Sequence, residues 1–350
     1  MVMRILHTSD LHLSKDKEYT IDALKCLIDT CNSESVDVLT IGGDMFHKPQ
    51  DVEQLRTELR KIFTGLDFDV ISISGNHDET AYTRNLDFGA KLKMVTKSPF
   101  EIITYDKVNL VALPYTETLT DEKYTQLKDA VDKDRFNALL IHCTLDIGYA
   151  SQDFGEEDER KYCPVSGTML ASLGYDIVLG GHFHKDYYVK KLGEAARFVY
   201  PGSPVSLSTG EIGQRQAALI DTEINSITRI PLKTHFYDKK SVSIFPGGEE
   251  SALQEIDEWK RAYNELNCTL SVEVDGFGEM DELDFREKLN SICGDVKTVN
   301  EYQDAGKVLN HSLYKRFVEK IDAIDSLNPE YVKETVIKIF SEMLAGRKIE

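Results

Sequence analysis

The sequence predicts a layered α/β fold with some antiparallel strands, followed by two smaller parts. Residues 1–230 alternate apolar runs typical of buried strands with segments whose apolar residues recur at the helical period of about 3.6. After about residue 186 the pattern changes to short strands separated by turn residues. We therefore predict a first domain over 1–232, an α+β capping domain over 233–303 and a helical tail over 304–350.

The elements of the first domain follow from these patterns. Helical spacing predicts helices around 21–31 and 52–63, and Asp51, followed three residues later by Gln54, predicts that Asp51 caps the second helix. Pro201-Gly202-Ser203-Pro204 is typical of a turn. The apolar runs that predict strands lie at 3–6, 36–41, 70–73, 138–141, 176–179, 197–200, 216–221 and 226–230.

The remaining residues predict an α+β unit and one further helix. The capping domain has the order β-α-β-α-β, with elements at 240–245, 251–266, 268–274, 281–292 and 296–302. In the tail, Asn328 is placed as an N-cap, Pro329 at the first helical position and Gly346 just after the end. The apolar stripe of this helix, 329–345, would contact a partner or pack on its own chain.

Composition limits the classes of function. The chain of 350 residues has a net charge of −19, with the acidic excess marked in 235–304 and absent after 304. Such a chain does not bind nucleic acid through a broad basic surface, so metal ions and a partner would have to supply much of the attraction. No apolar stretch approaches the roughly 18 residues of a membrane span, and because residues 1–7 contain no signal-peptide h-region we expect no signal peptide. The six cysteines form no C-x-x-C pair, so we expect reduced thiols and a cytoplasmic protein.

Six of the nine histidines stand in polar segments that directly follow predicted strands. Strand ends of an α/β sheet meet in one crevice, which would gather imidazoles and carboxylates into a site for two divalent ions. Such ligands suit manganese, iron or zinc, and the absence of thiolates argues against a structural zinc site. His7, His235 and His311 lie outside the pattern and are interpreted as structural or exposed. The segments are Asp10-Leu11-His12, Gly43-Asp44-Met45-Phe46-His47, Gly75-Asn76-His77-Asp78, His142 and Gly181-His182-Phe183-His184.

In order and spacing these segments resemble the signature of the calcineurin-like metallophosphoesterases, over residues 1 to about 230. The opening 5–13 and Tyr200-Pro201-Gly202-Ser203-Pro204 resemble more narrowly the SbcD-type nuclease subunits of double-strand-break repair. The resemblance implies an α/β/β/α sandwich with a small α+β cap and a C-terminal helix. It also implies two divalent ions, with Mn2+ expected.

The resemblance further implies a role for each site residue. Asp10, His12 and His184 would hold one ion, Asn76, His142 and His182 the other, and Asp44 would bridge them. His77 would act on the scissile phosphate as general acid or charge stabiliser, with Asp78 orienting it and His47 positioning DNA. Two alternatives stay open: Asp78 as the cap of a helix near Thr80, and His47 as an ordinary loop histidine. The chain departs from the family at Lys48-Pro49-Gln50 and at Cys143-Thr144, which leaves the fine substrate preference open.

The function predicted on this basis is a metal-dependent DNA nuclease, an exonuclease with endonuclease activity left open, in DNA end processing and double-strand-break repair. Its expected partners are DNA, an SMC-like coiled-coil ATPase of the SbcC type bound through 329–345, and a second copy paired through 51–65 and a helical stretch around 82–94. It would be cytoplasmic, and nucleoid-associated if prokaryotic. The alternatives are a small-molecule phosphodiesterase or phosphatase of the same superfamily, and a non-catalytic scaffold with a vestigial metal site.

Overall fold

The computed structural model describes residues 3–321 apart from 84–85, 147–162, 195, 305 and 307–311, together with residues 332, 335 and 336. The chain divides into two compact units, residues 1–237 and 238–350. The candidate site lies entirely in the first unit.

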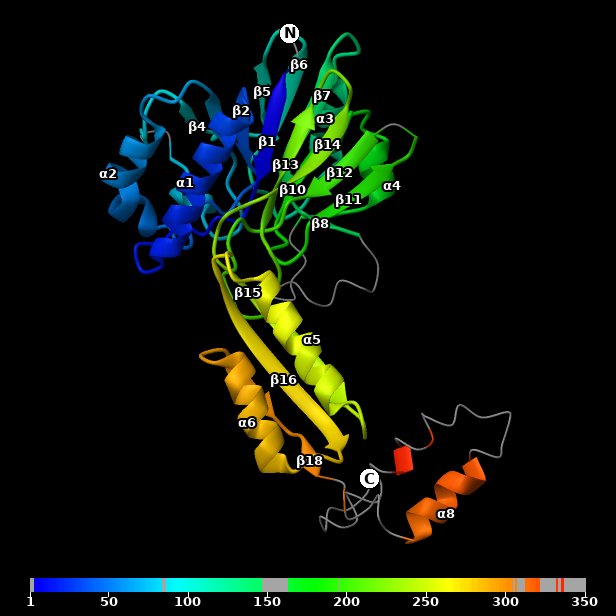
Figure 1. The fold of residues 1–350 in the computed structure, drawn as a ribbon. Helices are drawn as coiled ribbons and strands as arrows, with labels where there is room; N and C mark the ends of the chain where they lie inside the picture. Colours follow the sequence, from blue (N-terminus) through cyan, green and yellow to red (C-terminus); the bar gives the residue numbers. More distant parts are fainter. Residues whose placement is uncertain are drawn as a thin grey trace. The chain divides into compact units, whose positions relative to one another are not determined.

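The first unit contains two six-stranded sheets (Figure 1). The first sheet has the order β14-β13-β1-β2-β3-β4; β1 through β4 are parallel, and β13 and β14 extend the sheet in antiparallel pairing. Its strands are β1 (Arg4–Thr8), β2 (Val38–Ile41), β3 (Asp69–Ser72), β4 (Leu92–Met94), β13 (Gln216–Asp221) and β14 (Ser226–Pro231).

The second sheet has the order β11-β12-β10-β7-β6-β5, in which β12, β10, β7 and β6 are parallel and the two edge strands are antiparallel. Its strands are β5 (Glu101–Thr104), β6 (Val108–Leu113), β7 (Phe136–His142), β10 (Ile177–Gly181), β11 (Tyr188–Leu192) and β12 (Ala196–Tyr200). A small separate pair joins β8 (Thr144–Leu145) to β9 (Pro164–Val165).

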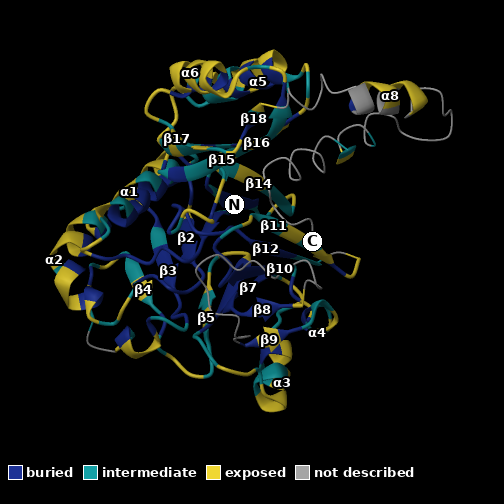
Figure 2. Cartoon of the chain, turned by 90° about the horizontal axis from the view of Figure 1, so that it is seen from below, coloured by how far each residue is buried: buried dark blue, intermediate teal, exposed yellow. Residues whose placement is uncertain are grey.

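The two sheets pack face to face, with helices outside. Ile5 and Ile71 of the first sheet share a buried cluster with Leu140 and Leu179 of the second. A second cluster joins the first sheet to α1 (Glu18–Ser33) and α2 (Asp51–Phe63). A third joins the second sheet to α3 (Asp121–Asp129) and α4 (Gly167–Ala171). Burial follows these layers, with buried strands inside and the exposed residues of α2 and α3 outside (Figure 2). The predicted α/β/β/α sandwich is confirmed.

Two local predictions in this unit are wrong, and the alternative that Asp78 caps a helix is also not borne out. Asp51 is the first residue of α2 and does not cap it; the N-cap position is Gln50, while the Asp51 carboxylate accepts hydrogen bonds from Ser14 Oγ and Lys48 N. No helix occupies the described residues of 82–94, where the chain forms a loop and then β4. Asp78 precedes the 3₁₀ turn η1 (Glu79–Ala81), but its side chain does not cap that turn.

The second unit packs two helices against a small sheet of order β15-β16-β17, with β18 also paired to β16. Val272 of β16 and Ile256 of α5 are buried together with Phe285 and Leu289 of α6. Asp281 caps α6, accepting hydrogen bonds from the N–H groups of Leu283 and Asp284. The elements are β15 (Phe236–Ile244), α5 (Glu249–Ala262), β16 (Cys268–Gly278), α6 (Glu282–Cys293), β17 (Lys297–Asn300), β18 (Gln303–Asp304) and α8 (Ser312–Ile321).

The predicted helix 329–345, with its cap at Asn328, lies almost entirely outside the described residues, as does His311. All six cysteines are free thiols. Among the described residues, no helix is both long enough and apolar enough to cross a membrane.

Candidate metal centre

Five loops at the carboxyl ends of β1, β2, β3, β7 and β10 carry the predicted ligands. The central parallel strands of each sheet end at the same edge, so residues up to 174 positions apart in the chain become neighbours. Backbone hydrogen bonds join the first two loops, from Asp10 N to Gly43 O (3.0 Å) and from His12 N to Asp44 O (3.0 Å). Asp10, His12, Asp44, His142, His182 and His184 are all buried.

The backbone of these loops is strained at the predicted ligands. Asp10, His12, Asp44 and His182 have φ values of 55°, 46°, 49° and 120°, in the region that residues with a side chain seldom adopt. Such conformations cost of order 1–3 kcal/mol each and gather at functional sites. The loops are therefore shaped to hold these four side chains in one place.

Two glycines give the ligands room. A Cβ at Gly43 would overlap the ring of His142, and a Cβ at Gly75 would overlap the carboxylate of Asp44. Gly43 also has a φ of 107°. Glycine is required at both positions because the backbone passes directly against a predicted ligand.

The first group of candidate ligands is Asp10, His12 and His184, whose ligand atoms all lie within 4.8 Å of one another. Nε2 of His12 is 3.1 Å from Nε2 of His184, and Nε2 of His184 is 3.9 Å from Oδ1 of Asp10. The far side of the His184 ring meets Glu211, with Nδ1 3.2 Å from Oε1. A carboxylate only accepts hydrogen bonds, so Nδ1 of His184 carries the proton and Nε2 presents a lone pair toward His12.

Glu211 is fully buried and held on both oxygens. Its Oε2 accepts hydrogen bonds from Leu207 N (2.8 Å) and Ser203 Oγ (3.2 Å). Burial acts to raise the pKa of Glu211, but the bond to His184, the charge of that ring and further donors outweigh burial and lower it. Glu211 is thus an ionised carboxylate behind a predicted metal ligand, an arrangement that orients metal-binding histidines.

The second group is Asp10, Asp44 and His142, again with ligand atoms within 4.8 Å of one another. Nδ1 of His142 lies 2.9 Å from Gly42 O, and since a carbonyl only accepts, this nitrogen carries the proton. Nε2 therefore presents its lone pair to Asn76 Oδ1 at 2.9 Å and to Asp44 Oδ2 at 3.4 Å. The ring of His182 lies beside that of His142, with centroids 5.3 Å apart.

This donor set fits divalent cations. In each group a histidine nitrogen with a lone pair faces a carboxylate oxygen: Nε2 of His184 faces Asp10 Oδ1 at 3.9 Å, and Nε2 of His142 faces Asp44 Oδ2 at 3.4 Å. Such pairs repel unless a positive charge lies between them. Mixed imidazole and carboxylate ligands without thiolates are what manganese, iron and zinc accept. All seven predicted ligands lie in this centre: Asp10, His12, Asp44, Asn76, His142, His182 and His184.

The predicted catalytic residues lie beside the centre. The ring of His77 is 4.8 Å from that of His12, and its backbone N–H donates to Asp44 Oδ1 (2.9 Å). The ring of His47 stacks on that of His77, with centroids 6.3 Å apart and planes 14° apart. Burial lowers the pKa of His47, and the charges of Lys17 and His77 lower it further.

Asp78 is buried and holds two loops together. Its carboxylate accepts hydrogen bonds from Gly75 N (2.8 Å) and Phe46 N (3.1 Å). Burial raises its pKa to about 7, against the opposing effect of these bonds and of the charge of His77. Asp78 thereby fixes the loop of Asn76 and His77 against the loop of Asp44.

Sequence reasoning missed Glu211 and its neighbour Arg215. Arg215 is buried and donates to the carbonyls of Ser203, Lys185 and His184, so it fixes the loop that carries His184. Neither residue has a spacing signal, because Glu211 is one acidic residue among 60. The clue available in the sequence was the turn at 201–204, which closes the segment behind His184.

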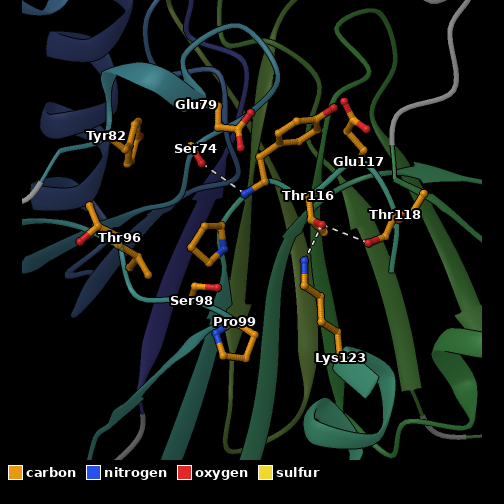
Figure 3. Close-up of a pocket in the computed structure, with 13 residues that line it drawn as sticks. Ser74, Glu79, Tyr82, Thr96, Ser98, Pro99, Thr116, Glu117, Thr118 and Lys123 are labelled. Carbon is orange, nitrogen blue, oxygen red and sulfur yellow. Dashed lines mark hydrogen bonds between the residues drawn. The ribbon is translucent and has the colours of Figure 1, made fainter. Parts of the chain in front are cut away.

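A side pocket of about 500 Å³ adjoins the centre (Figure 3). The side pocket is lined by Ser74, Glu79, Tyr82, Val95, Thr96, Ser98, Pro99, Pro114, Tyr115, Thr116, Glu117, Thr118 and Lys123.

The family model of the calcineurin-like phosphoesterases matches residues 3–186. The chain belongs to this family. The match covers more than half of the chain and every predicted ligand from Asp10 to His184. This phosphoesterase is therefore a hydrolase of phosphate esters, with a candidate site for divalent metal ions.

Two curated relatives resemble this phosphoesterase. An uncharacterised metallophosphoesterase of Bacillus subtilis, YhaO, is 22% identical over 283 residues, which cover 73% of this chain and 67% of the relative. The SbcD component of the nuclease SbcCD of Escherichia coli is 34% identical over 88 residues, which cover 23% of this chain and 22% of that protein.

Two solved structures also align with it. One is a dimetal phosphatase from Danio rerio, with a TM-score of 0.45 and 10% identity, covering 66% of this chain and 96% of that one. The other is GAP50, described as the anchor in the inner membrane complex of Plasmodium, with a TM-score of 0.42 and 12% identity, covering 66% and 89%.

Proposed function

We propose that this phosphoesterase is a two-metal nuclease that hydrolyses phosphodiester bonds at DNA ends. The observation that carries the proposal is the convergence of ligand atoms from His12, His184, His142, Asp44 and Asn76, with His77 beside them. A site built this way is suited to two cations rather than to a covalent nucleophile. In this proposal Asp10, His12 and His184 would hold one ion and Asn76, His142 and His182 the other, and Asp44 would contribute to both. Bound divalent ions would supply Lewis-acid stabilisation of the charge that develops on the phosphate oxygens.

The residues of the chain position the substrate and move the proton. His77 is half-buried, so its ring can reach a bound phosphate while its backbone is anchored on Asp44 Oδ1. In our proposal it donates a proton or hydrogen bond to the departing oxygen. Asp78 keeps the loop of His77 in place, and His47, whose ring lies parallel to that of His77, is proposed to help position DNA.

DNA is proposed as the substrate on two grounds. The sequence signature resembles SbcD-type nucleases, and the 88-residue similarity to the SbcD component of SbcCD supports that resemblance.

The net charge of −19 means that the chain offers little general attraction for a polyanion. A partner that contributes DNA contacts is therefore part of the proposal.

The proposed partner is an SMC-like ATPase of the SbcC type, bound by the helix at 329–345. Its apolar stripe consists of Val332, Val336, Ile339, Phe340, Met343 and Leu344. Deletion of 328–350 should abolish co-purification with the ATPase while manganese-dependent cleavage of a small phosphodiester persists. If the shortened protein loses that basal activity, the helix belongs to the core of this chain and the docking proposal fails.

The homodimer also stays a proposal, but the apolar residues of α2 do not require it. Leu55, Leu59 and Phe63 are buried in the core of the chain itself, and Ile62 packs against that core. The apolar side of α2 is therefore satisfied without a second copy. Light scattering of the purified protein decides between monomer and dimer.

A second candidate function is hydrolysis of small phosphodiesters. The size of the side pocket, about 500 Å³, favours it, because this is the range of pockets that enclose a small ligand. Bis-p-nitrophenyl phosphate, single-stranded DNA and duplex ends, each tested with manganese, separate the two candidates. Cleavage of the small diester without cleavage of DNA would leave the second candidate.

Two variants and one control test the roles assigned to the centre. Asp44→Asn should lose bound metal together with turnover, whereas His77→Gln should keep its metal and lose about 100-fold or more in kcat. His235→Gln is the matched control, because His235 is a half-buried histidine of the same unit outside the centre. Loss of metal from His77→Gln would make His77 a ligand, and full activity in Asp44→Asn would end the two-metal interpretation.

A further inference from the structure

We propose that the side pocket binds one nucleoside attached to the scissile phosphate, and so selects nucleotide esters over other phosphodiesters. This inference deepens the proposed function and rests on it, because it takes the phosphate to lie at the metal centre. Three features of the pocket support it: its connection to the centre, its size and the chemistry of its walls.

The inner wall of the pocket is continuous with the metal centre. Ser74 stands two residues before Asn76, and its Oγ accepts a hydrogen bond from Tyr115 N at 3.2 Å (Figure 3). The ring of Tyr115 meets that of His142 nearly edge-on, with centroids 6.2 Å apart. Glu79 directly follows Asp78 in the same loop. A substituent on a phosphate held at His142 and Asn76 therefore enters the pocket next to Tyr115.

The pocket has the size of one small ligand. Its volume of about 500 Å³ lies within the usual range for enclosed ligand sites, which is roughly 300–1,000 Å³. Thr96 and Ser98 form the wall opposite Thr116 and Thr118 (Figure 3). A single nucleoside fits such a space, whereas a base-paired duplex does not enter it.

The walls favour a neutral group rich in hydrogen-bond donors and acceptors. Glu79 and Glu117 bring two carboxylates and Lys123 one ammonium group, so the formal charge of the lining is negative and repels a second phosphate. Nζ of Lys123 donates to Thr116 Oγ1 (2.6 Å), which in turn donates to Thr118 O (3.0 Å). Sugar hydroxyls and the edge of a base match carboxylate and hydroxyl partners.

The same lining disfavours the other common substituents of phosphodiesters. Its aliphatic side chains are Val95, Pro99 and Pro114, too few to bury an acyl chain. A second phosphate in the pocket, as in a pyrophosphate, would meet two carboxylates against the single ammonium group of Lys123, whereas the terminal nucleoside of a DNA end brings no second phosphate. A nucleoside is the substituent that satisfies both size and charge.

The test uses two diesters that share one leaving group, thymidine 5′-(p-nitrophenyl phosphate) and methyl p-nitrophenyl phosphate, with the full chain and manganese. Thr96→Trp and Thr118→Trp fill the pocket from opposite walls. Lys97→Trp is the matched control, because Lys97 is an exposed neighbour outside the lining. The measured quantity is the ratio of kcat/KM for the nucleoside ester to kcat/KM for the methyl ester.

We expect the unmodified protein to prefer the nucleoside ester by about tenfold or more, and both filled variants to lose that preference through a higher KM. Their activity on the methyl ester should stay close to that of Lys97→Trp. If the methyl ester is cleaved and the ratio is near one, or is unchanged in the filled variants, the pocket proposal fails alone. If neither ester is cleaved with manganese, the proposed function itself fails.

Discussion

His7 should make the stability of the first unit strongly dependent on pH. It lies on β1 between the sheets and is fully buried. Its Nε2 is 3.0 Å from Gly180 O in the second sheet, and its Nδ1 is 3.0 Å from Thr40 Oγ1. The carbonyl can only accept, so the neutral ring donates from Nε2 and accepts at Nδ1. A second proton would break the bond from Thr40 and place a charge in the core.

The pKa of His7 gives the size of the effect. Burial lowers it from 6.5 to about 4, more than the two hydrogen bonds raise it. The unfolded chain therefore binds a proton that the folded chain excludes between these values. Stability is complete above a pH of about 6.5 and falls as pH decreases toward 4; the loss is about 2 kcal/mol at pH 5 and about 3 kcal/mol at pH 4.

The test compares the unmodified protein with His7→Gln, in which the amide can still donate toward Gly180. Hydrogen exchange of β1, β2 and β10 reports the first unit at about pH 8 and about pH 5, with a chelator present to remove metal effects. Tryptophan fluorescence would not serve, because the single tryptophan, Trp259, belongs to the second unit. The unmodified protein should lose about 2 kcal/mol more than the variant over this interval. Equal losses in the two proteins would refute the assignment of a buried neutral His7.

Three further outcomes are expected. Glu211→Gln should weaken manganese binding by about 10- to 100-fold in calorimetry, because the amide orients His184 less strongly than a carboxylate. Unchanged affinity in Glu211→Gln would contradict this role. Unchanged affinity in Glu211→Asp would be consistent with it, because that variant keeps the carboxylate. Gly43→Ala should lower both the melting temperature and the metal content, because the added Cβ overlaps the ring of His142. Gly65→Ala is the control: Gly65 also has a positive φ, but no atom lies near its Cβ position, so only the melting temperature should fall. Equal metal loss in both variants would refute the steric argument. Manganese at about 100 times its dissociation constant should stabilise the first unit by about 2.7 kcal/mol, and an unchanged unfolding curve would speak against a folded-state site.

The strands that carry the site were predictable because each combines two independent signals. A fully buried parallel strand is a continuous apolar run, and its carboxyl end must leave the sheet through a polar loop. Leu39 and Ile41 before Asp44, and Ile177 to Leu179 before His182, show both signals, and the structure places these strands as predicted. The family match then supports the interpretation of the loops as a metal centre.

Other features could not be predicted, for physical reasons. Aspartate is a residue type that commonly caps helices, but the Asp51 carboxylate instead accepts a hydrogen bond from Ser14, which is 37 residues away in the sequence. The stretch 82–94 has helical spacing, yet its end pairs with β3 as an edge strand, and such tertiary pairing overrides local preference. Glu211 becomes meaningful only when the fold brings it to His184. These contacts join residues that are far apart in the sequence, so local sequence patterns do not predict them.

The ligand set is divided between the two sheets. Asp10, His12, Asp44 and Asn76 follow strands of the first sheet, whereas His142 ends a strand of the second and His182 and His184 follow another. The bonds from His142 to Gly42 O and from His7 to Gly180 O tie the sheets together beside the centre. In the proposed mechanism the spacing of the two layers therefore sets the distance between the two halves of the site. A substitution in the shared core that changed this spacing would be expected to change the rate of hydrolysis without touching a ligand.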